Sequence, residues 1–542
     1  MKKTLACFLA LVLMLGMINL SLAAEDPLGK FDPPITITYA RNANINPKFA
    51  PDQDYEHNIW MTEYDEVLGI NVDTIWTAEG VEAYDMQLNL RIANGDIPDM
   101  FVCNAAQFQL LVEADMLEDL TDVFEAYQSD LVRDNFTADE GKGLGMATVG
   151  GKLYGIPDSA VTAGKFHFVF LREDWRLALG LPVPETLSDL VAIADAFTNQ
   201  DPDGNGVKDT YGFAISNEPF ETYFSVPGWF NSFGAFPEQW IMKDGEVVHG
   251  SIQPEMKTAL AALRDWVEQG LIDPEFKVKG SWPVSEDAVA GKSGIASAEW
   301  WLLSWPLPDA FKNGHDWRAY PILYDESAPV QKVGGTATLG NRYVVRKGYE
   351  HPEALVKMYN LFQERVMSMN YDIRIYKGDD EFSYEGLTAV YAVVGHDRNM
   401  RNHMVVSEAV DKRDPSMLEN VDQEKLYKDI VNFIENMDAL NIDEQATAWG
   451  GHAGSYGPTS VYGRLKYLED NGMFNVDPFY GAATPAMQSY AGQLKSNTAE
   501  MILMIMTGEK PIDYFDEFVA NWKALGGDEM TEEVNAWYQA QQ

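Results

Sequence analysis

The chain has 542 residues, and its 83 acidic side chains outnumber its 40 lysines and arginines to give a formal charge of -43. A protein that binds nucleic acid or an anionic membrane needs a basic face. The excess of acidic side chains therefore excludes both functions. The hydrophobic fraction of 46% argues against a disordered chain. Because single cores stop growing at roughly 250–300 residues, the sequence predicts a folded acidic protein with more than one domain.

The amino terminus has the pattern of a secretory signal. Two lysines at its start precede an apolar run from Phe8 to Met17, and the small residues around Ala23 suit a signal peptidase. The run is shorter than the roughly 20 residues that a membrane-spanning helix needs. We therefore predict that residues 1–23 are a signal peptide and that the mature protein is exported.

The two cysteines bear on anchoring and on disulfides. Bacterial lipoproteins carry a lipidated cysteine after the apolar run, whereas Cys7 stands before it. The sequence has no convincing lipobox, so we expect a periplasmic protein or one that is extracellular or at the cell surface. Loss of the signal leaves only Cys103, and a single thiol cannot form an internal disulfide.

Strands and helices alternate in the first part of the mature chain. Residues 35–39 alternate apolar and polar side chains as a strand does, and a helix over 58–68 ends at Gly69, a natural left-handed cap. The next predicted strand, helix and strand are 70–76, 81–94 and 100–103. This order is typical of an α/β domain with a parallel sheet.

The same alternation resumes after residue 165. A strand over 165–171 precedes a helix that Thr186 caps and that continues to Phe197, and Pro254 opens a further amphipathic helix. The remaining predicted elements are a strand at 342–345 and helices at 352–366, 423–437, 484–507 and 511–524. No flexible linker divides the chain, which predicts two lobes between which the chain crosses more than once.

An acidic turn has the pattern of a calcium loop. Side-chain oxygens stand at its positions 1, 3, 5 and 9, and glycine stands at position 6. Position 12, where an EF-hand has a bidentate glutamate, is Gly212, so a further ligand must come from elsewhere. We predict a structural Ca²⁺ site, with an acidic turn without metal as the alternative. The candidate ligands are Asp201, Asp203, Asn205, Asp209, the backbone carbonyl of Val207 and the hydroxyl of Thr210.

Tryptophans are dense near Gly, Pro and Ser. They include Trp229, Trp240, Trp282, Trp300, Trp301, Trp305 and Trp449. Flat apolar sugar faces stack on such rings, although core packing explains most tryptophans in any protein. Trp300 and Trp301 are adjacent, and adjacent residues of a strand point to opposite faces. We therefore expect one of these two rings to face a cleft.

Catalytic patterns are weak. The eight histidines lack zinc spacing, and the carboxylates are too numerous for pairing alone to identify the acid and base of a glycosidase. The segment from Ala453 to Gly457 departs from a nucleophile elbow at its first position. We predict that the protein is not an enzyme. The alternatives are an exported glycoside hydrolase or polysaccharide lyase, and a peptide-binding or sensory protein.

Several short segments, in their order and spacing, carry a family resemblance. They are Gly95-Asp96-Ile97-Pro98-Asp99, Lys152 to Pro157, Leu171 to Pro184, Gly291 to Gly294 followed by Trp300-Trp301, and the C-terminal segments 479–485, 511–513 and 522–527. Together they resemble bacterial extracellular solute-binding proteins, the capture components of ABC importers for sugars. The C-terminal segments resemble the long oligosaccharide-binding lipoproteins of Gram-positive bacteria. That subgroup, like the alginate-binding proteins, carries a calcium loop where residues 201–209 lie.

The resemblance implies an α/β fold of the periplasmic-binding-protein type II class, a two-lobed Venus flytrap with several hinge crossings that closes on its ligand. It places the N-terminal lobe at residues 24–160 and about 335–395. The C-terminal lobe then comprises about 161–334 and 396–542. The implied partners are an oligosaccharide in the cleft and the permease subunits of an ABC importer, with the binding protein as a monomer.

The candidate ligand contacts come from both lobes. The net charge favours a neutral or low-charge glycan, because an anionic one would need local Arg or Lys. The aromatic candidates are Phe220, Tyr223, Trp229, Trp300, Trp301 and Trp449, and the polar candidates are Asp99, Asn104 and Gln107.

Overall fold

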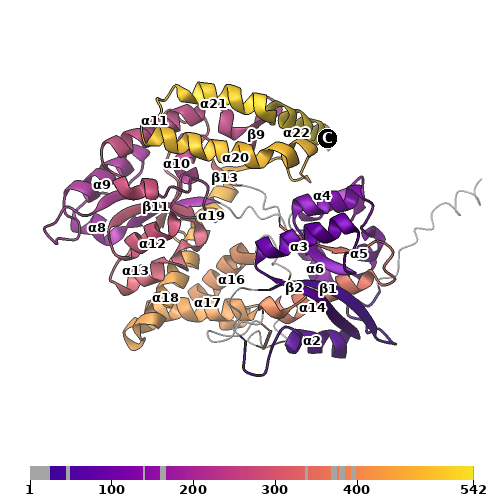
Figure 1. Ribbon diagram of the computed structural model, residues 1–542. Helices are drawn as coiled ribbons and strands as arrows, with labels where there is room; N and C mark the ends of the chain where they lie inside the picture. Colours follow the sequence, from indigo (N-terminus) through magenta and orange to yellow (C-terminus); the bar gives the residue numbers. More distant parts are fainter. Residues whose placement is uncertain are drawn as a thin grey trace, which may run out of the picture.

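Two lobes make up the molecule, and Figure 1 shows the indigo N-terminal lobe apart from the magenta and yellow C-terminal lobe. The computed structural model describes residues 25–43, 49–137, 141–158, 166–335, 340–367, 371, 375–376, 385–391, 398–481 and 483–540. The predicted signal peptide over 1–23 lies outside these residues, and so do the predicted lobe boundaries at 160 and 395.

The N-terminal lobe is organised by a five-stranded sheet with the order β2-β1-β3-β14-β6. β1 (Ile35–Ala43) pairs in parallel with β2 (Ile70–Glu79) and β3 (Met100–Cys103). β14 (Arg342–Val345) is antiparallel to both β3 and β6 (Ile156–Pro157). The predicted parallel pairing therefore holds for the first three strands, whereas β14, which returns from the other lobe, reverses the direction.

Helices cover this sheet much as the sequence predicts. α2 (Ile59–Glu63) continues through the π turn η1 (Tyr64–Leu68) to Gly69, which has a left-handed φ of 65°. α3 (Val81–Asn94) ends at a second left-handed glycine, Gly95, and α14 (Glu353–Met367) follows β14. The other elements of this lobe are α4 (Ala105–Glu113), α5 (Thr121–Tyr127), α6 (Asp130–Thr137), α7 (Lys142–Gly145), β4 (Thr148–Val149), β5 (Lys152–Leu153) and η5 (Glu385–Leu387).

The C-terminal lobe has a four-stranded sheet with the order β12-β7-β11-β8. Its centre is the antiparallel pair β7 (His167–Arg172) and β11 (Ser293–Glu299), both buried along their whole length. β8 (Tyr211–Ala214) is parallel to β11, and β12 (Trp317–Tyr320) is antiparallel to β7. The carboxyl end of β11 leads directly into Trp300 and Trp301.

Long helices pack around that sheet. In α9 (Leu187–Asn199), Thr186 caps the helix as predicted, and Asp189 completes a reciprocal capping box with it. Pro254 begins α11 (Glu255–Glu268). The other elements in this part of the chain are α8 (Glu173–Ala178), α10 (Pro227–Asn231), β9 (Trp240–Lys243), β10 (Glu246–His249), η2 (Gly250–Ile252), η3 (Pro274–Val278), α12 (Ser281–Val289), η4 (Trp300–Leu303), α13 (Leu307–Lys312) and β13 (Val333–Gly335).

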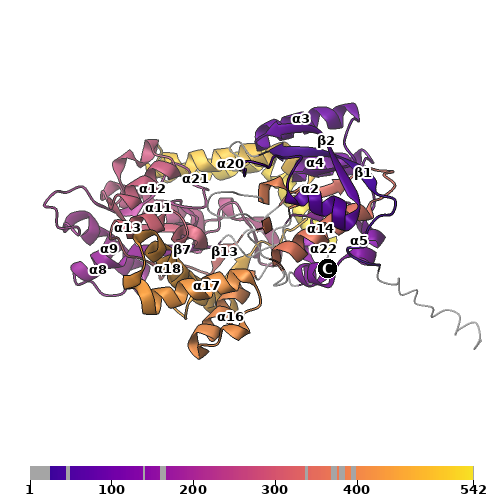
Figure 2. The ribbon, with the colours of Figure 1, turned by 90° about the horizontal axis from the view of Figure 1, so that it is seen from below.

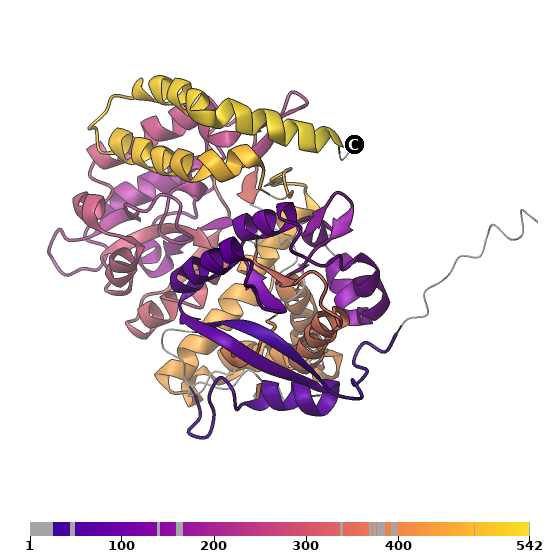
Figure 3. The same ribbon diagram turned by 45° about the vertical axis from the view of Figure 1, so that its right-hand side comes forward.

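The last part of the chain is mainly helical. Figure 2 shows α16 (Arg398–Lys412), α17 (Val421–Val431) and α18 (Ile442–Ser455) on the side of the C-terminal lobe, and Figure 3 shows the yellow helices that end the chain along its outer edge. The π turn η7 (Asn432–Asn436) extends α17 as predicted. The remaining elements are η6 (Pro415–Met417), η8 (Met437–Ala439), α19 (Val461–Asp470), β15 (Phe474–Val476), α20 (Pro485–Met506), α21 (Tyr514–Trp522), η9 (Lys523–Gly527) and α22 (Asp528–Ala540).

Each lobe has its own hydrophobic core. The N-terminal core is built from side chains between residues 37 and 156 and between 343 and 390. The C-terminal core is built from side chains between 166 and 333 and between 449 and 534. The chain therefore passes between the lobes more than once, as predicted. Within the part of the chain that the structure describes, no helix is both long and apolar enough to span a bilayer.

Candidate ligand-binding site

Trp300 and Trp301 lie on the single 3-10 turn η4 that follows β11, and not on a strand as predicted. Successive residues of such a turn are about 120° apart around its axis, so the two rings still face different surroundings. Trp301 lies near Tyr223 and Trp305, whereas Trp300 lies near Tyr462. The end of β11 therefore presents aromatic side chains in two directions.

Four rings form a connected aromatic row at the end of β11: Tyr223, Trp282, Trp301 and Trp305. The ring centroids of Tyr223 and Trp301 are 5.4 Å apart in an edge arrangement, and Trp301 stacks on Trp305 at 6.1 Å. Trp305 stacks in turn on Trp282 at 5.3 Å, and Trp282 is 57% exposed. Tyr223, Trp301 and Trp305 are half-buried. The row therefore keeps flat apolar surface in contact with solvent.

The backbone and one carboxylate hold the row in place. The N–H of Glu299 donates to the carbonyl of Thr222 at 2.9 Å, which ties the segment before Tyr223 to the end of β11. Phe224 has a left-handed φ of 52°, a rare conformation for a bulky residue, and its ring is buried beside the half-buried Tyr223. Buried Glu299 accepts a hydrogen bond of 3.1 Å from the indole N–H of Trp301. The orientation of the Trp301 ring is thus set by the protein alone.

Carboxylates surround the aromatic row. Glu286 accepts from the indole N–H of Trp282 at 3.2 Å, and Glu218 accepts from the backbone N–H of Ser281 at 2.7 Å. Burial, with smaller contributions from Glu221 and Glu218, raises the pKa of Tyr223, so its hydroxyl stays neutral. Flat rings can bind the apolar face of a sugar, and the carboxylate oxygens beside them can accept hydrogen bonds from its hydroxyls.

Trp282 and Trp305 were not among the predicted contacts, although they share the sequence signal of the other tryptophans. Both lie near Pro and Ser, as Trp300 and Trp301 do. In space, Trp305 lies beside Trp301 and Trp282 lies beside Trp305, and no sequence pattern reports these positions.

Two of the predicted aromatic contacts lie in the core instead. Trp229 is 0% exposed and packs edge-on against Phe213 at 5.1 Å. Trp449 is also fully buried, stacks on Phe311 at 5.2 Å, and donates its indole N–H to Asp316 at 3.3 Å. Protein atoms cover both rings, so they have no face for a ligand. Phe220 is half-buried and packs against the core of the C-terminal lobe.

The predicted polar contacts of the N-terminal lobe are occupied by internal hydrogen bonds. Asn104 and Gln107 form a capping box at the start of α4. The Asn104 amide also donates to the carboxylate of Asp85 at 3.0 Å, and the Gln107 amide donates to Asn89 at 3.1 Å. Gln107 is buried. These side chains therefore shape the end of β3.

Asp99 and Asn104, both predicted as polar contacts, flank β3 at its opposite ends and so do not lie side by side. Five residue steps along a strand span about 16 Å. The Asp99 carboxylate accepts from the Thr38 hydroxyl at 2.6 Å and pairs with Arg346 at 2.7 Å. Although burial raises its pKa, the hydrogen bonds from Thr38 and Arg346 outweigh that effect and lower the pKa of Asp99. Asp99 thus joins β1, β3 and the end of β14.

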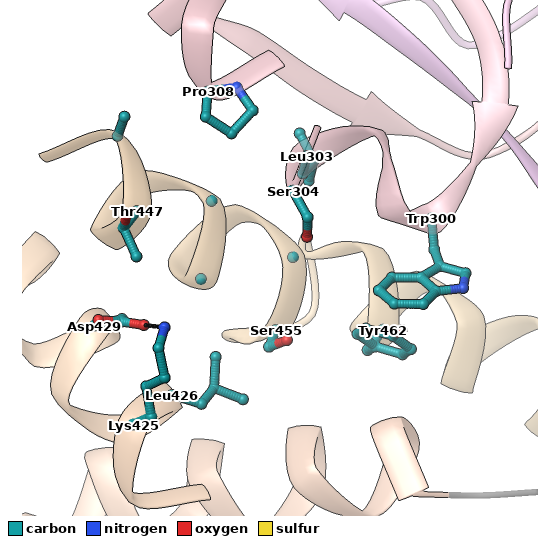
Figure 4. A pocket seen from close by; sticks show the side chains of 14 residues that line it. Trp300, Leu303, Ser304, Pro308, Lys425, Leu426, Asp429, Thr447, Ser455 and Tyr462 are labelled. Atoms are coloured by element: carbon teal, nitrogen blue, oxygen red, sulfur yellow. Dashed lines mark hydrogen bonds and ion pairs between the residues drawn. The ribbon is translucent and has the colours of Figure 1, made fainter. Parts of the chain in front are cut away.

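A pocket of about 390 Å³ lies on the other side of η4, beside Trp300. Figure 4 shows the rings of Trp300 and Tyr462 at one end, with centroids 5.5 Å apart, and the ion pair of Lys425 and Asp429 at the other. Helix α18 forms one wall, where Gly454 belongs to the lining. The pocket lies within the C-terminal lobe, between η4, α17 and α18.

The predicted calcium loop follows α9 and folds back on itself. The amide nitrogen of Asn205 donates to Asp203 at 2.8 Å and to Asp209 at 3.2 Å, and the Asp201 carboxylate accepts from the N–H of Gly206 at 3.0 Å. Burial, with the nearby carboxylates of Asp201 and Asp209, raises the pKa of Asp203. The chemistry of these oxygen donors suits Ca²⁺, and the Asn205 amide stands between two of the acids.

Two observations concern how the side chains of this loop are placed to bind a metal ion. Across the described ranges, no group of three or more His, Cys, Asp or Glu side chains is placed to hold a metal ion. The Thr210 hydroxyl is buried and donates to the carbonyl of Phe197 at 2.8 Å. Thr210 is therefore turned into the lobe and away from the loop, in contrast to its predicted role as a ligand.

Two lobes with separate cores, and a row of half-buried rings at a strand end, define a two-lobed ligand-binding protein. The model of the bacterial extracellular solute-binding protein family matches residues 50–363, which is more than half of the chain. The chain belongs to this family.

Three known proteins illustrate the relationship. Lipoprotein LipO of Bacillus subtilis is 25% identical over 258 residues, covering 46% of this chain and 48% of LipO. The fructooligosaccharide ABC transporter substrate-binding protein FusA of Streptococcus pneumoniae is 27% identical over 238 residues, covering 41% of this chain and 43% of FusA. The matches span less than half the length of these two relatives. The alginate-binding protein AlgQ2, in a crystal structure without calcium ion, has a TM-score of 0.61 and 15% identity, covering 95% of this chain and 100% of AlgQ2. This likeness confirms the predicted two-lobed type II fold.

Proposed function

We propose that the protein captures an oligosaccharide between its lobes and delivers it to an ABC-type importer. The observation that carries this proposal is the aromatic row of Tyr223, Trp282, Trp301 and Trp305, which keeps ring surface exposed beside carboxylates. Exposed large aromatic groups in a well-folded protein mark binding surfaces more often than single exposed apolar side chains do. The names of FusA, a fructooligosaccharide transporter's substrate-binding protein, and of the alginate-binding protein AlgQ2 support a carbohydrate as the ligand class.

Capture would proceed by closure of the lobes. A ligand that contacts both lobes stabilises the closed state by its difference in affinity for the two states. We assign residues 24–160 and about 335–395 to one lobe, and about 161–334 and 396–542 to the other. The make-up of the two hydrophobic cores supports this division.

The ligand contacts that we propose are Trp301 and Tyr223 from the predicted set, joined by Trp282 and Trp305. Phe220 lies next to this row in sequence and keeps part of its surface exposed. We further propose that the protein acts by binding and not by catalysis, as an exported monomer of the periplasm or cell surface that engages permease subunits. Membership of an extracellular solute-binding family supports this location.

Titration calorimetry with linear oligosaccharides tests the function. The panel should contain neutral and uronic-acid chains of matched length, and a folded Trp301→Ala variant serves as the control. We expect saturable binding of a neutral oligosaccharide that weakens in Trp301→Ala. Failure of the wild-type protein to bind any member would contradict the proposal, and release of products from a polysaccharide would favour a hydrolase or lyase.

We also propose that the loop over residues 201–209 holds a structural Ca²⁺ ion. The ligands would be Asp201, Asp203, Asn205, Asp209 and the carbonyl of Val207. Rotation of the Asn205 amide would turn its oxygen, in place of its nitrogen, toward an ion held between the carboxylates of Asp203 and Asp209. The convergence of Asp203 and Asp209 on Asn205 supports this site.

A further inference from the structure

We propose that the pocket beside Trp300 is a separate subsite for a neutral pyranose ring at one end of the bound chain, an inference that rests on the proposed function. The pocket's volume of about 390 Å³ is large enough for one sugar ring with ordered water. It lies inside the C-terminal lobe and does not depend on closure. Four features of its lining support this assignment.

The three glycines of α18 that line the pocket differ in what a Cβ atom at each would contact. A Cβ atom on Gly450 would lie 2.7 Å from the carbonyl of Leu303, and one on Gly451 would lie 3.1 Å from the Cβ of Asp429. Close packing thus requires glycine at 450 and leaves little room for a side chain at 451. A Cβ atom on Gly454 would meet nothing within 4 Å, yet glycine in a helix is less stable than alanine. Gly454 therefore serves no packing need and leaves the pocket open.

The charged groups of the pocket compensate each other. Lys425 and Asp429 lie one turn apart on α17 and pair at 3.0 Å. They are the charged side chains among the described residues of the lining. The pair engages Oδ2 of Asp429, which leaves Oδ1 to accept from a sugar hydroxyl while the lysine donates to another. Such a paired site suits a neutral polyol better than a carboxylate.

The opposite end of the pocket is aromatic. The half-buried ring of Trp300 meets the ring of Tyr462 at an interplanar angle of 51° (Figure 4). Two tilted rings form a corner into which the apolar edge of a pyranose fits, while its hydroxyls point toward the ion pair. Apolar walls with a few placed polar groups are the usual composition of a small-molecule pocket.

The adjacency of Trp300 and Trp301 links the pocket to the aromatic row. One turn of 3-10 helix carries both residues, with Trp301 in the row and Trp300 at the pocket. An oligosaccharide that stacks on Trp301 therefore has a second aromatic ring at the adjacent residue, Trp300. The structure thus favours a ligand longer than the aromatic row alone would hold, whose terminal ring is neutral.

A filled pocket tests the subsite. We compare Gly454→Leu with Gly492→Leu, since Gly492 is also a helix glycine whose Cβ would meet nothing within 4 Å, but lies on α20 outside the pocket. Calorimetry uses neutral linear oligosaccharides from disaccharide to hexasaccharide and the same series with a terminal uronic acid. Gly454→Ala is a smaller substitution for the case in which leucine impairs folding, and melting curves check all three variants.

We expect Gly454→Leu to weaken binding of the longest neutral chains about tenfold, to leave the shortest binding chain unchanged, and to remove the gain in affinity with length. Gly454→Ala should show a smaller loss, Gly492→Leu none, and terminal uronic acids no gain from the pocket. Equal affinities of wild type and Gly454→Leu for every length, or an equal loss for every length, would overturn the subsite alone. Absence of binding by the wild type would overturn the proposed function instead.

Discussion

The carboxyl ends of β3 and β11 differ in what their side chains still offer to a ligand. At the end of β3, Asn104 and Gln107 are engaged by each other and by α3. At the end of β11, the rings around Trp301 keep exposed faces, and the hydrogen bond to Glu299 fixes only an edge. The end of β11 therefore keeps side-chain surface available for a ligand, whereas these two polar side chains at the end of β3 are already engaged.

The largest expected effect tests the division between core and site tryptophans. Trp229→Ala should lower the free energy of unfolding by about 3–5 kcal/mol, because it empties a fully buried site. Trp282→Ala, at a ring that is 57% exposed, should change it far less. Urea denaturation measures both. If Trp229→Ala kept its stability and lost ligand, the division would be wrong.

The second test contrasts one aspartate from each lobe. Burial raises the pKa of Asp477 to about 7, despite hydrogen bonds from the N–H groups of Phe479 and Trp240. The folded protein therefore holds a proton that the unfolded chain loses near pH 4. The free energy of unfolding should fall by about 1.4 kcal/mol per pH unit as pH rises from about 4 to about 7.

Asp477→Asn should remove the fall in the free energy of unfolding between about pH 4 and about pH 7. Asp99→Asn is the matched control with the opposite sign, because hydrogen bonds lower the pKa of Asp99 and its contribution is lost as the solution becomes acidic. Unfolding curves at several pH values report both slopes. A wild-type slope in Asp477→Asn would show that another group titrates in this range.

Calcium removal tests the loop at 201–209, which lies away from both strand ends. At a free concentration one hundred times its dissociation constant, Ca²⁺ should stabilise the fold by about 2.7 kcal/mol. Chelation should lower the melting temperature, and Asp203→Ala should remove that sensitivity. Lys208→Ala, on the same loop but without a proposed oxygen ligand, should remain sensitive. An unchanged melting temperature on chelation would refute the site.

Loss of one ring of the aromatic row should affect affinity more than stability. Trp301→Ala should raise the dissociation constant for the best oligosaccharide about tenfold, which corresponds to about 1.4 kcal/mol. Trp301→Phe should retain more of the affinity because it keeps an aromatic face. Calorimetry provides the constants, and equal affinity in Trp301→Ala would remove the basis for the C-terminal lobe as the main binding surface.

The smallest effect concerns the end of β3 in the N-terminal lobe, where Asn104 caps α4. Asn104→Ala should cost about 1 kcal/mol of stability, the usual loss for a helix cap, with little direct loss of affinity. Asn104→Ser, which can still cap α4, should recover most of the stability. A loss of affinity with unchanged stability would instead show that Asn104 touches the ligand, and the comparison between the lobes would have to be revised.

Much of the secondary structure could be predicted because it depends on interactions between residues that are close in the sequence. The capping box of Thr186 and Asp189, and the left-handed glycines 69 and 95, depend on residues within a few positions of each other. Helix α18 escaped prediction because its glycines weaken a helical pattern, and tertiary packing against Leu303 and Asp429 is what favours glycine there. The family resemblance was also confirmed. It depends on short segments in a fixed order, which can be recognised directly in the sequence.

The sequence by itself determined an acidic, two-lobed α/β binding protein with aromatic side chains suited to sugars. Only the tertiary structure decided which rings are available, since Trp229 and Trp301 have similar sequence surroundings but different neighbours in space. It also separated Asp99 from Asn104, because a strand carries its two ends to opposite edges of a sheet. Burial and direction are set by residues far apart in the chain, and composition cannot report them.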